Sequence, residues 1–288
     1  MSQGLHLEGQ QSLLEVYFRG SAQPGADEFT VRLANSLLVR VTGSTYLSWN
    51  IGEDIQGSTS SDTATIAGKE ELGDGSTMLK LSGIQESEVF SIGETITGQT
   101  TGESGTIDNS VMNLTNLSNS NFQLNEQVVD QSSGATADIK GAHVEMLELN
   151  NINGSFEKNN TIVGQESGAS AVISSHYAGV PGMFVGDTAS DIVDEAANYT
   201  PPTLSANDTD WSTLGTSIDG NAYVETREIT IEASGGDLGP INLLVITVDI
   251  DGGGEEIVST GPIKGTPPSE VISSGGSLTI THQEKISN

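Results

Sequence analysis

Histidine and acidic side chains are the groups in this sequence that could do acid–base chemistry or bind a metal. The four histidines lie far apart, and none has a carboxylate at the spacing of a metal site, so each is expected to be an isolated surface or edge residue: His6, His143, His176 and His282. Cysteine is absent, which excludes disulfides and thiolate metal sites. No nucleophile can be paired with a base, so we predict no enzyme, no cofactor and no metal.

Three glutamates suggest a second kind of chemistry, because they share one position in a recurring block of sequence: Glu53, Glu94 and Glu126. Two carboxylates held close together can act as general acid and general base. The fourth copy of the block has Asn160 at that position, however. A polar residue beside a turn explains all four copies, and we therefore predict a structural role for these glutamates.

Two glycine-rich segments resemble ligand-binding loops only superficially. Residues 249–256 read DIDGGGEE, which lacks the third acidic position of a calcium loop and has no flanking helices, so an acidic hairpin tip is expected. The segment GETITG at 93–98 does not lead from a strand into a helix, as a phosphate-binding loop would. Neither segment predicts a ligand site.

The recurring block has eighteen residues and begins at Trp49, Phe90, Phe122 and Phe156. An aromatic residue opens each copy, a branched residue stands at position seven, and isoleucine stands at position eighteen. This spacing predicts a β-hairpin with a buried face. The predicted repeat core is Trp49, Ile55, Phe90, Ile96, Phe122, Val128, Phe156 and Ile162.

Position four of the block predicts a tight turn with a positive φ angle. It is occupied by the residue types that accept that conformation: Gly52, Gly93, Asn125 and Asn159. Between the blocks run strands that resemble one another, TMLKLSGI, VMNLTNL and EMLELNNI. We expect the hairpins and returning strands to stack into a rod.

The rest of the chain is expected to form a small antiparallel β base domain, so that the protein is mainly β. Residues 5–19 predict one amphipathic helix, and Leu13, Leu14, Tyr17 and Phe18 on it are candidates for core packing or for a partner interface. The predicted division is a base domain over 1–43, the inserted repeats over 44–179, and the rest of the base over 180–288. The run from 241 to 248 is apolar at nearly every position, which predicts a strand buried on both faces.

The charge of the chain limits its partners. It has 39 acidic and 10 basic residues, a formal net charge of −29, so binding to nucleic acid or to an anionic membrane surface is not expected. The excess of carboxylates predicts a solvated surface, with cation binding between acidic faces as the alternative. No secretion signal or apolar span is recognised, so synthesis in the cytosol is expected.

Both ends of the chain resemble structural proteins of tailed-phage particles. At the start the resemblance rests on GLHLEGQQSLLEVYFRGSAQPGADEFTVRLANS. At the end it rests on DIVDEAANYTPPTLSANDTDW, AYVETREITIEASGGDLGPINLLVITVDIDGGGEEIVSTGP and SLTITHQEKIS. In that group these pieces follow one another as one β-rich domain, which implies that here the base domain is interrupted. The recurring block is similar to modules of phage tail and capsid-associated proteins.

The resemblance implies a non-enzymatic virion protein, made in the host cytoplasm and placed on the exterior of the capsid or neck. Its expected partners are other virion proteins and further copies of itself as a homo-oligomer. The alternative is a tail-fibre or adaptor protein that binds a host glycan through an exposed aromatic residue, for which Trp211 is the best candidate beside Tyr46, Trp49, Tyr177 and Tyr199. A bacterial surface adhesin is a third possibility, against which the missing export signal counts.

Overall fold

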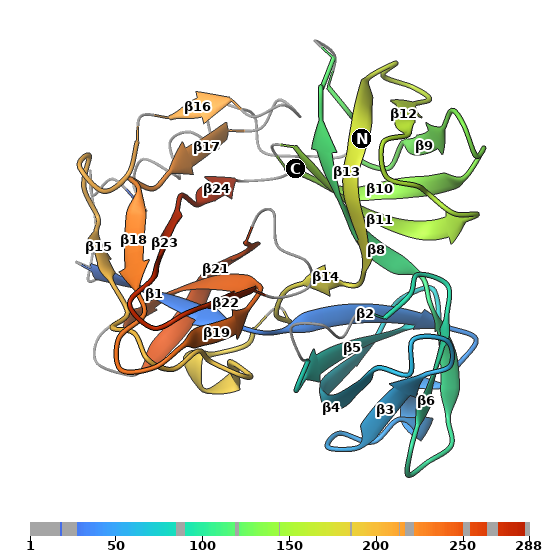
Figure 1. Ribbon diagram of the computed structural model, residues 1–288, viewed down its shortest axis with the longest axis horizontal. Coiled ribbons are helices and arrows are strands. Elements are labelled where there is room, and N and C mark those ends of the chain that lie inside the picture. Colours follow the sequence, from blue (N-terminus) through green and yellow to red (C-terminus); the bar gives the residue numbers. More distant parts are fainter. Residues whose placement is uncertain are drawn as a thin grey trace. The chain divides into compact units, whose positions relative to one another are not determined.

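The computed structural model consists mainly of antiparallel β-strands (Figure 1). It describes Phe18 and residues 28–84, 90–118, 121–143, 145–184, 186–212, 214–216, 222–249, 254–263 and 270–285. The helix predicted over 5–19 lies outside these residues except for Phe18, and so do the interface candidates Leu13, Leu14 and Tyr17. Within the described ranges, two short 3-10 helices occur, η1 (Tyr46–Ser48) and η2 (Ala189–Asp191).

The chain divides into two compact units. The first contains the described residues of Met1–Ala34, Phe184–Ile263 and Glu270–Asn288, and the second contains those of Asn35–Met183. The division therefore falls after residue 34 and after residue 183, whereas the sequence prediction put it after 43 and after 179. The strand at Leu37–Thr42, which the prediction gave to the base domain, belongs to the second unit.

The first unit contains a four-stranded sheet with three smaller sheets. The large sheet has the order β15-β1-β20-β21, in which β1 pairs with β20 from Phe29↔Val248 to Ala34↔Leu243. Residues Leu243 to Val248 of β20 are all buried, which confirms the two-sided burial predicted for this run. The strands of the unit are β1 (Glu28–Ala34), β15 (Thr203–Ser205), β16 (Gly215–Thr216), β17 (Ala222–Glu225), β18 (Ile229–Glu232), β19 (Leu238–Ile241), β20 (Leu243–Asp249), β21 (Glu255–Pro262), β22 (Glu270–Ile272), β23 (Ser277–Ile280) and β24 (Gln283–Lys285).

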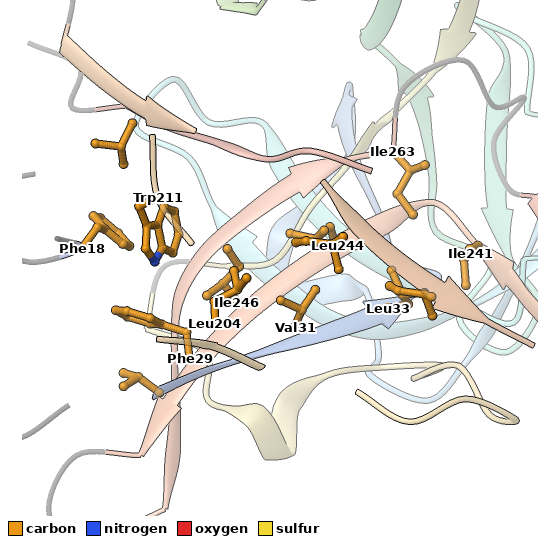
Figure 2. Close-up of a cluster of buried hydrophobic side chains, with 14 of the residues drawn as sticks. Phe18, Phe29, Val31, Leu33, Leu204, Trp211, Ile241, Leu244, Ile246 and Ile263 are labelled. Carbon is orange, nitrogen blue, oxygen red and sulfur yellow. The ribbon is translucent and has the colours of Figure 1, made fainter. Parts of the chain in front are cut away.

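Three aromatic side chains close one end of the core of this unit (Figure 2). The ring of Phe18 lies 4.5 Å from that of Trp211 and 5.5 Å from that of Phe29, between centroids. Phe18 is only 5% exposed, so it packs within its own unit instead of offering a contact to a partner. Stacked and tilted aromatic pairs of this kind stabilise a core beyond the area that they bury.

The second unit contains two closed six-stranded arrangements with the same strand order. The first runs β2-β5-β4-β3-β6-β7 and closes because β2 also pairs with β7, and the second runs β8-β11-β10-β9-β12-β13 and closes onto β8. We call them barrel 1 and barrel 2. Barrel 1 has β2 (Leu37–Thr42), β3 (Asp54–Gly57), β4 (Thr63–Glu71), β5 (Thr77–Ser82), β6 (Thr95–Gly98) and β7 (Ser104–Ile107); barrel 2 has β8 (Asn109–Thr115), β9 (Gln127–Asp130), β10 (Thr136–His143), β11 (Met146–Asn153), β12 (Thr161–Gly164) and β13 (Ser170–Ala178), and β14 (Val180–Pro181) extends the sheet of barrel 1 beside β2.

The expected rod of stacked two-stranded modules is replaced by pairs of hairpins. Barrel 1 joins the hairpins β3–β4 and β6–β7 through β3 and β6, and barrel 2 joins β9–β10 and β12–β13 through β9 and β12. A closed barrel has no free strand edge, whereas each hairpin in a rod would keep one. The strands that were expected to link successive hairpins instead complete the two barrels, as β5, β8 and β11.

The eight residues predicted as a repeat core are all buried, with exposed fractions between 0% and 7%. They belong to two separate clusters, because Trp49, Ile55, Phe90 and Ile96 lie inside barrel 1 while Phe122, Val128, Phe156 and Ile162 lie inside barrel 2. The residues at position four all have positive φ, between 65° and 86°, as the turn prediction required: Gly52, Gly93, Asn125 and Asn159.

Candidate functional site

Three of the four segments of similar sequence (49–66, 90–107, 122–139 and 156–173) have glutamate at the same position, and these glutamates are buried inside the barrels. Glu53 and Glu94 are each 5% exposed and Glu126 is 1% exposed. Each carboxylate accepts a hydrogen bond from the backbone of its own segment, and the donors are the N–H groups of Asn50, Ser91 and Gln123. Carboxylates held in this way are fully engaged in local structure, as expected for a structural role.

Each glutamate of barrel 1 also reaches the hairpin loop of the other segment. The carboxylate of Glu94 accepts hydrogen bonds from the N–H groups of Thr59 and Ser60, at 3.2 and 2.9 Å, and from the Ser60 hydroxyl at 2.8 Å. Glu53 does the same for Thr101, whose N–H and hydroxyl lie 3.2 and 3.0 Å from Oε2. The two segments of barrel 1 therefore hold each other's loops.

Barrel 2 has this arrangement on one side only. Glu126 Oε2 accepts from the N–H groups of Glu166 and Ser167, at 3.1 and 3.0 Å. On the other side the carboxylate belongs to Asp130, which accepts from the N–H groups of Ser132 and Ser133 in its own loop and, at 2.8 Å, from the side-chain amide of Asn160. Asn160 stands where the other segments have glutamate, and Asp130 stands where they have glycine.

The glycines at position nine leave space for the incoming carboxylates. A β-carbon on Gly98 would lie 2.6 Å from Glu53 Oε2, and one on Gly164 would lie 2.6 Å from Glu126 Oε2. Gly57 faces Glu94 in the same way. Glycine at position nine and glutamate at position five therefore form one feature shared by two segments.

Hydrogen bonding keeps the carboxyls of Glu53, Glu126 and Asp130 ionised in spite of their burial. Burial raises the pKa of Glu126, but the N–H groups of Ser167, Gln123 and Glu166 and the Ser167 hydroxyl outweigh it and bring the pKa below its ordinary value. Burial also raises the pKa values of Glu53 and Asp130, but hydrogen bonds outweigh it and lower both. For Glu53 the donors are the N–H groups of Asn50 and Thr101 and the Thr101 hydroxyl. For Asp130 they are the Asn160 side-chain amide and the N–H groups of Ser132 and Ser133. None of the three is poised to donate a proton near neutral pH.

Two histidines contact serines, an arrangement that occurs in hydrolases. His176 Nε2 lies 2.7 Å from Ser110 Oγ, and His282 Nε2 lies 2.8 Å from Ser259 Oγ. Ser110 is fully buried, so its hydroxyl is not presented to a substrate, and burial lowers the pKa of His176 to about 4. Such an imidazole is a weak base. His6 and the side chain of His143 lie outside the described residues.

One arginine that the sequence analysis did not single out links the barrels. Arg40 of β2 is 7% exposed and forms ion pairs with Asp74 and Asp108 in addition to a hydrogen bond to Ser76 Oγ. Asp108 in turn accepts a hydrogen bond from the N–H of Ile152 at the far end of β11, 2.9 Å away. A buried guanidinium needs such partners, so this network is structural. A lone arginine in a strand gave no sign of it.

The aromatic residues proposed for sugar contact differ in exposure. Trp211 and Trp49 are 0% exposed, so the glycan contact predicted for Trp211 is wrong for this conformation, because its ring is covered by Phe18 and Phe29. Tyr199 is half-buried, and its hydroxyl accepts a hydrogen bond from the N–H of Leu33 at 2.9 Å. Of the five aromatic candidates, Tyr46 and Tyr177 are half-exposed and their hydroxyls form no hydrogen bond within the described residues.

Tyr177 lines a surface pocket of about 430 Å³ in the second unit. Three stretches of chain form it: Phe90 to Ile92, Gly154 to Phe156, and His176 to Ala178. The first two stretches contain the first residues, Phe90 and Phe156, of two segments of similar sequence. The third stretch is the end of β13, which is longer than its hairpin partner β12. The pocket is the strongest candidate for a binding site among the described residues.

Two structural features are absent from the described part of the chain, a cluster of metal-binding side chains and a helix long enough to cross a membrane. No group of three or more His, Asp or Glu residues there could hold a metal ion, and no helix there could cross a membrane. The acidic segment at 249–256 is described only in part, and its Glu255 bonds to Arg32 and Thr247.

No protein-family model matches the chain, and no curated protein matches its sequence.

Proposed function

We propose that this chain is a non-enzymatic structural protein of a tailed-phage particle, on the exterior of the capsid or neck. The observation that carries the proposal is the pairing of β1 with β20. β1 lies in the first of the two stretches whose sequence resembles phage structural proteins, β20 lies in the second, and neither strand belongs to the barrels. One interrupted domain is the arrangement that the resemblance implies.

The second unit, Asn35–Met183, stands in the chain between these two stretches. In the proposed role the first unit attaches to the particle and the second unit is displayed from it as paired barrels, each a duplicate of the same strand order. The two barrels are then a repeated module, in which two segments of similar sequence make one closed structure. Hairpins that are fully paired with each other leave few free edges for unwanted association.

The charge of the chain supports an outward position. A net charge of −29 would be repelled by packaged DNA inside a shell, whereas it keeps an exterior surface solvated. Attachment then rests on apolar contact or strand pairing, because exposed ion pairs contribute little. The largest exposed apolar side chains of the described residues, Leu47 and Ile51, are 80% and 63% exposed. Two side chains are far smaller than a stable interface, so a partner must also use other surface.

Immunogold electron microscopy tests this proposal. Antibodies raised against the purified chain are applied to intact particles of the phage that encodes it. We expect gold on the capsid or neck of unopened particles. Gold only on tail fibres would overturn that position in favour of the receptor-binding alternative, and an absence of the chain from purified, protease-washed particles by mass spectrometry would overturn the virion role itself.

A further inference from the structure

The pocket beside Tyr177 has an apolar floor and a polar rim. Phe90, Phe156 and Ala178 on the floor are 3%, 7% and 3% exposed. Ser91 and Ser155 are exposed at the rim, and half-buried side chains complete the lining: Ile92, His176 and Tyr177. Within the described residues, the hydroxyls of Ser91, Ser155 and Tyr177 form no hydrogen bond to another protein group. The site therefore combines apolar contact with unused hydrogen-bonding groups.

We propose that this pocket binds an uncharged saccharide. A sugar ring presents C–H groups on its faces and hydroxyls around its edge, which matches an aromatic floor surrounded by serine and tyrosine hydroxyls. The volume of about 430 Å³ lies within the range of small-molecule sites, roughly 300–1,000 Å³. Binding of a sugar in this pocket does not depend on the proposed structural function.

The charges of the lining exclude other classes of ligand. None of its residues is Lys, Arg, Asp or Glu, although the chain has 39 acidic residues. A phosphate or a sulfated ligand would lack a cationic partner and would meet a strongly negative protein. A metal ion would lack carboxylate ligands. A wholly apolar ligand would leave the rim hydroxyls without partners when it displaced their water.

Contacts beneath the pocket hold its imidazole in place. The His176 ring meets Phe156 edge to face, with centroids 5.4 Å apart, and its Nε2 lies 2.7 Å from Ser110 Oγ. Burial lowers the pKa of His176 to about 4, so the ring is neutral at physiological pH and its second nitrogen can exchange a hydrogen bond with a hydroxyl. A preorganised lining loses little conformational freedom when a ligand binds.

Saturation-transfer NMR on the full chain tests the proposal. The probes are four neutral disaccharides (lactose, maltose, cellobiose and chitobiose) and two anionic sugars, sialyllactose and glucose 6-phosphate. We expect transfer to at least one neutral disaccharide and weaker transfer to the anionic sugars. The proposal is overturned if none of the neutral disaccharides receives saturation, or if glucose 6-phosphate binds more tightly than all of them.

Variants then locate the binding. Tyr177→Ala is expected to weaken the neutral disaccharide roughly tenfold, and Ser155→Ala to weaken it less, while Tyr46→Ala serves as the matched control because Tyr46 is half-exposed in barrel 1 away from the pocket. Tyr177→Phe keeps the ring and removes only the hydroxyl, so it remains informative if Tyr177→Ala does not fold. Equal affinity in the wild type, Tyr177→Phe and Ser155→Ala would overturn the proposal. These outcomes do not depend on where immunogold places the chain.

Discussion

Barrel 1 and barrel 2 differ in which segment supplies the carboxylate to a hairpin loop. In barrel 1, two glutamates cross between segments, and each enters the space above a glycine of the other segment. In barrel 2, Glu126 and Gly164 repeat this arrangement, whereas Asp130 and Asn160 reverse it. The strand register is the same in both, because Ile55 pairs with Gly98 in barrel 1 and Ile162 pairs with Asp130 in barrel 2.

The difference shows which property the fold requires. Each hairpin loop donates backbone N–H groups to a buried carboxylate, and an N–H group left there without an acceptor is costly. The carboxylate that accepts from them can come from the partner segment, as Glu126 does, or from the loop's own strand, as Asp130 does. The fold thus requires one carboxylate at each hairpin loop, and either the loop's own segment or the partner segment can supply it.

Removal of the Glu126 carboxylate is expected to have the largest effect on this comparison. Glu126→Ala leaves the N–H groups of Gln123, Glu166 and Ser167 without their acceptor and should lower the free energy of unfolding by about 3 kcal/mol. Urea unfolding followed by circular dichroism measures this. Glu157→Ala is the control, since Glu157 is an exposed carboxylate in the same barrel. Equal stability of the two variants would contradict the capping role.

Filling the space that glycine leaves should have the next largest effect. In Gly164→Ala the new β-carbon would meet both Glu126 Oε2 and Ser167 Oγ at 2.6 Å, so we expect a loss of about 2 kcal/mol from overpacking. Gly73→Ala is the matched control, because nothing lies within 4 Å of a β-carbon there. If both alanine variants unfold at the same urea concentration, close packing of the carboxylate against position nine is not required.

Acid should reduce the contribution of Glu126 by a smaller amount than its removal does. The folded pKa lies below the ordinary value of 4.5, so the stabilisation is complete well above pH 4.5 and declines as the pH falls through that value toward the folded pKa. We expect the difference in unfolding free energy between the wild type and Glu126→Gln to be largest at pH 7 and to narrow by pH 3. A difference that stays constant over this range would mean that ionisation of Glu126 does not matter.

The sequence was sufficient for the local structure of each hairpin. Positive φ at position four follows from Gly and Asn, because other side chains are strained in that conformation, and the buried faces follow from the alternation of apolar residues. It was also sufficient for the two-sided burial of β20. These features depend on neighbouring residues alone.

The pairing of segments depends on distant contacts, which local patterns do not contain. The linking strands looked like connectors, and their closure of each barrel could not be read from spacing. One sign was present, however: the segment with Asp130 in place of glycine occurs together with the segment that has Asn160 in place of glutamate. The pocket was missed because its three stretches meet only in the folded chain.

Replacing Asp130 and Asn160 of barrel 2 by the residue types that barrel 1 has at those positions tests most directly whether each hairpin loop needs one carboxylate. Asn160→Glu alone places a second carboxylate beside Asp130, and Asp130→Gly alone removes the acceptor of Ser132 and Ser133, so each single variant should lose about 2 kcal/mol or more. The double variant restores the arrangement of barrel 1 and should unfold within about 1 kcal/mol of the wild type. A double variant whose loss equals the sum of the two single losses would contradict the account.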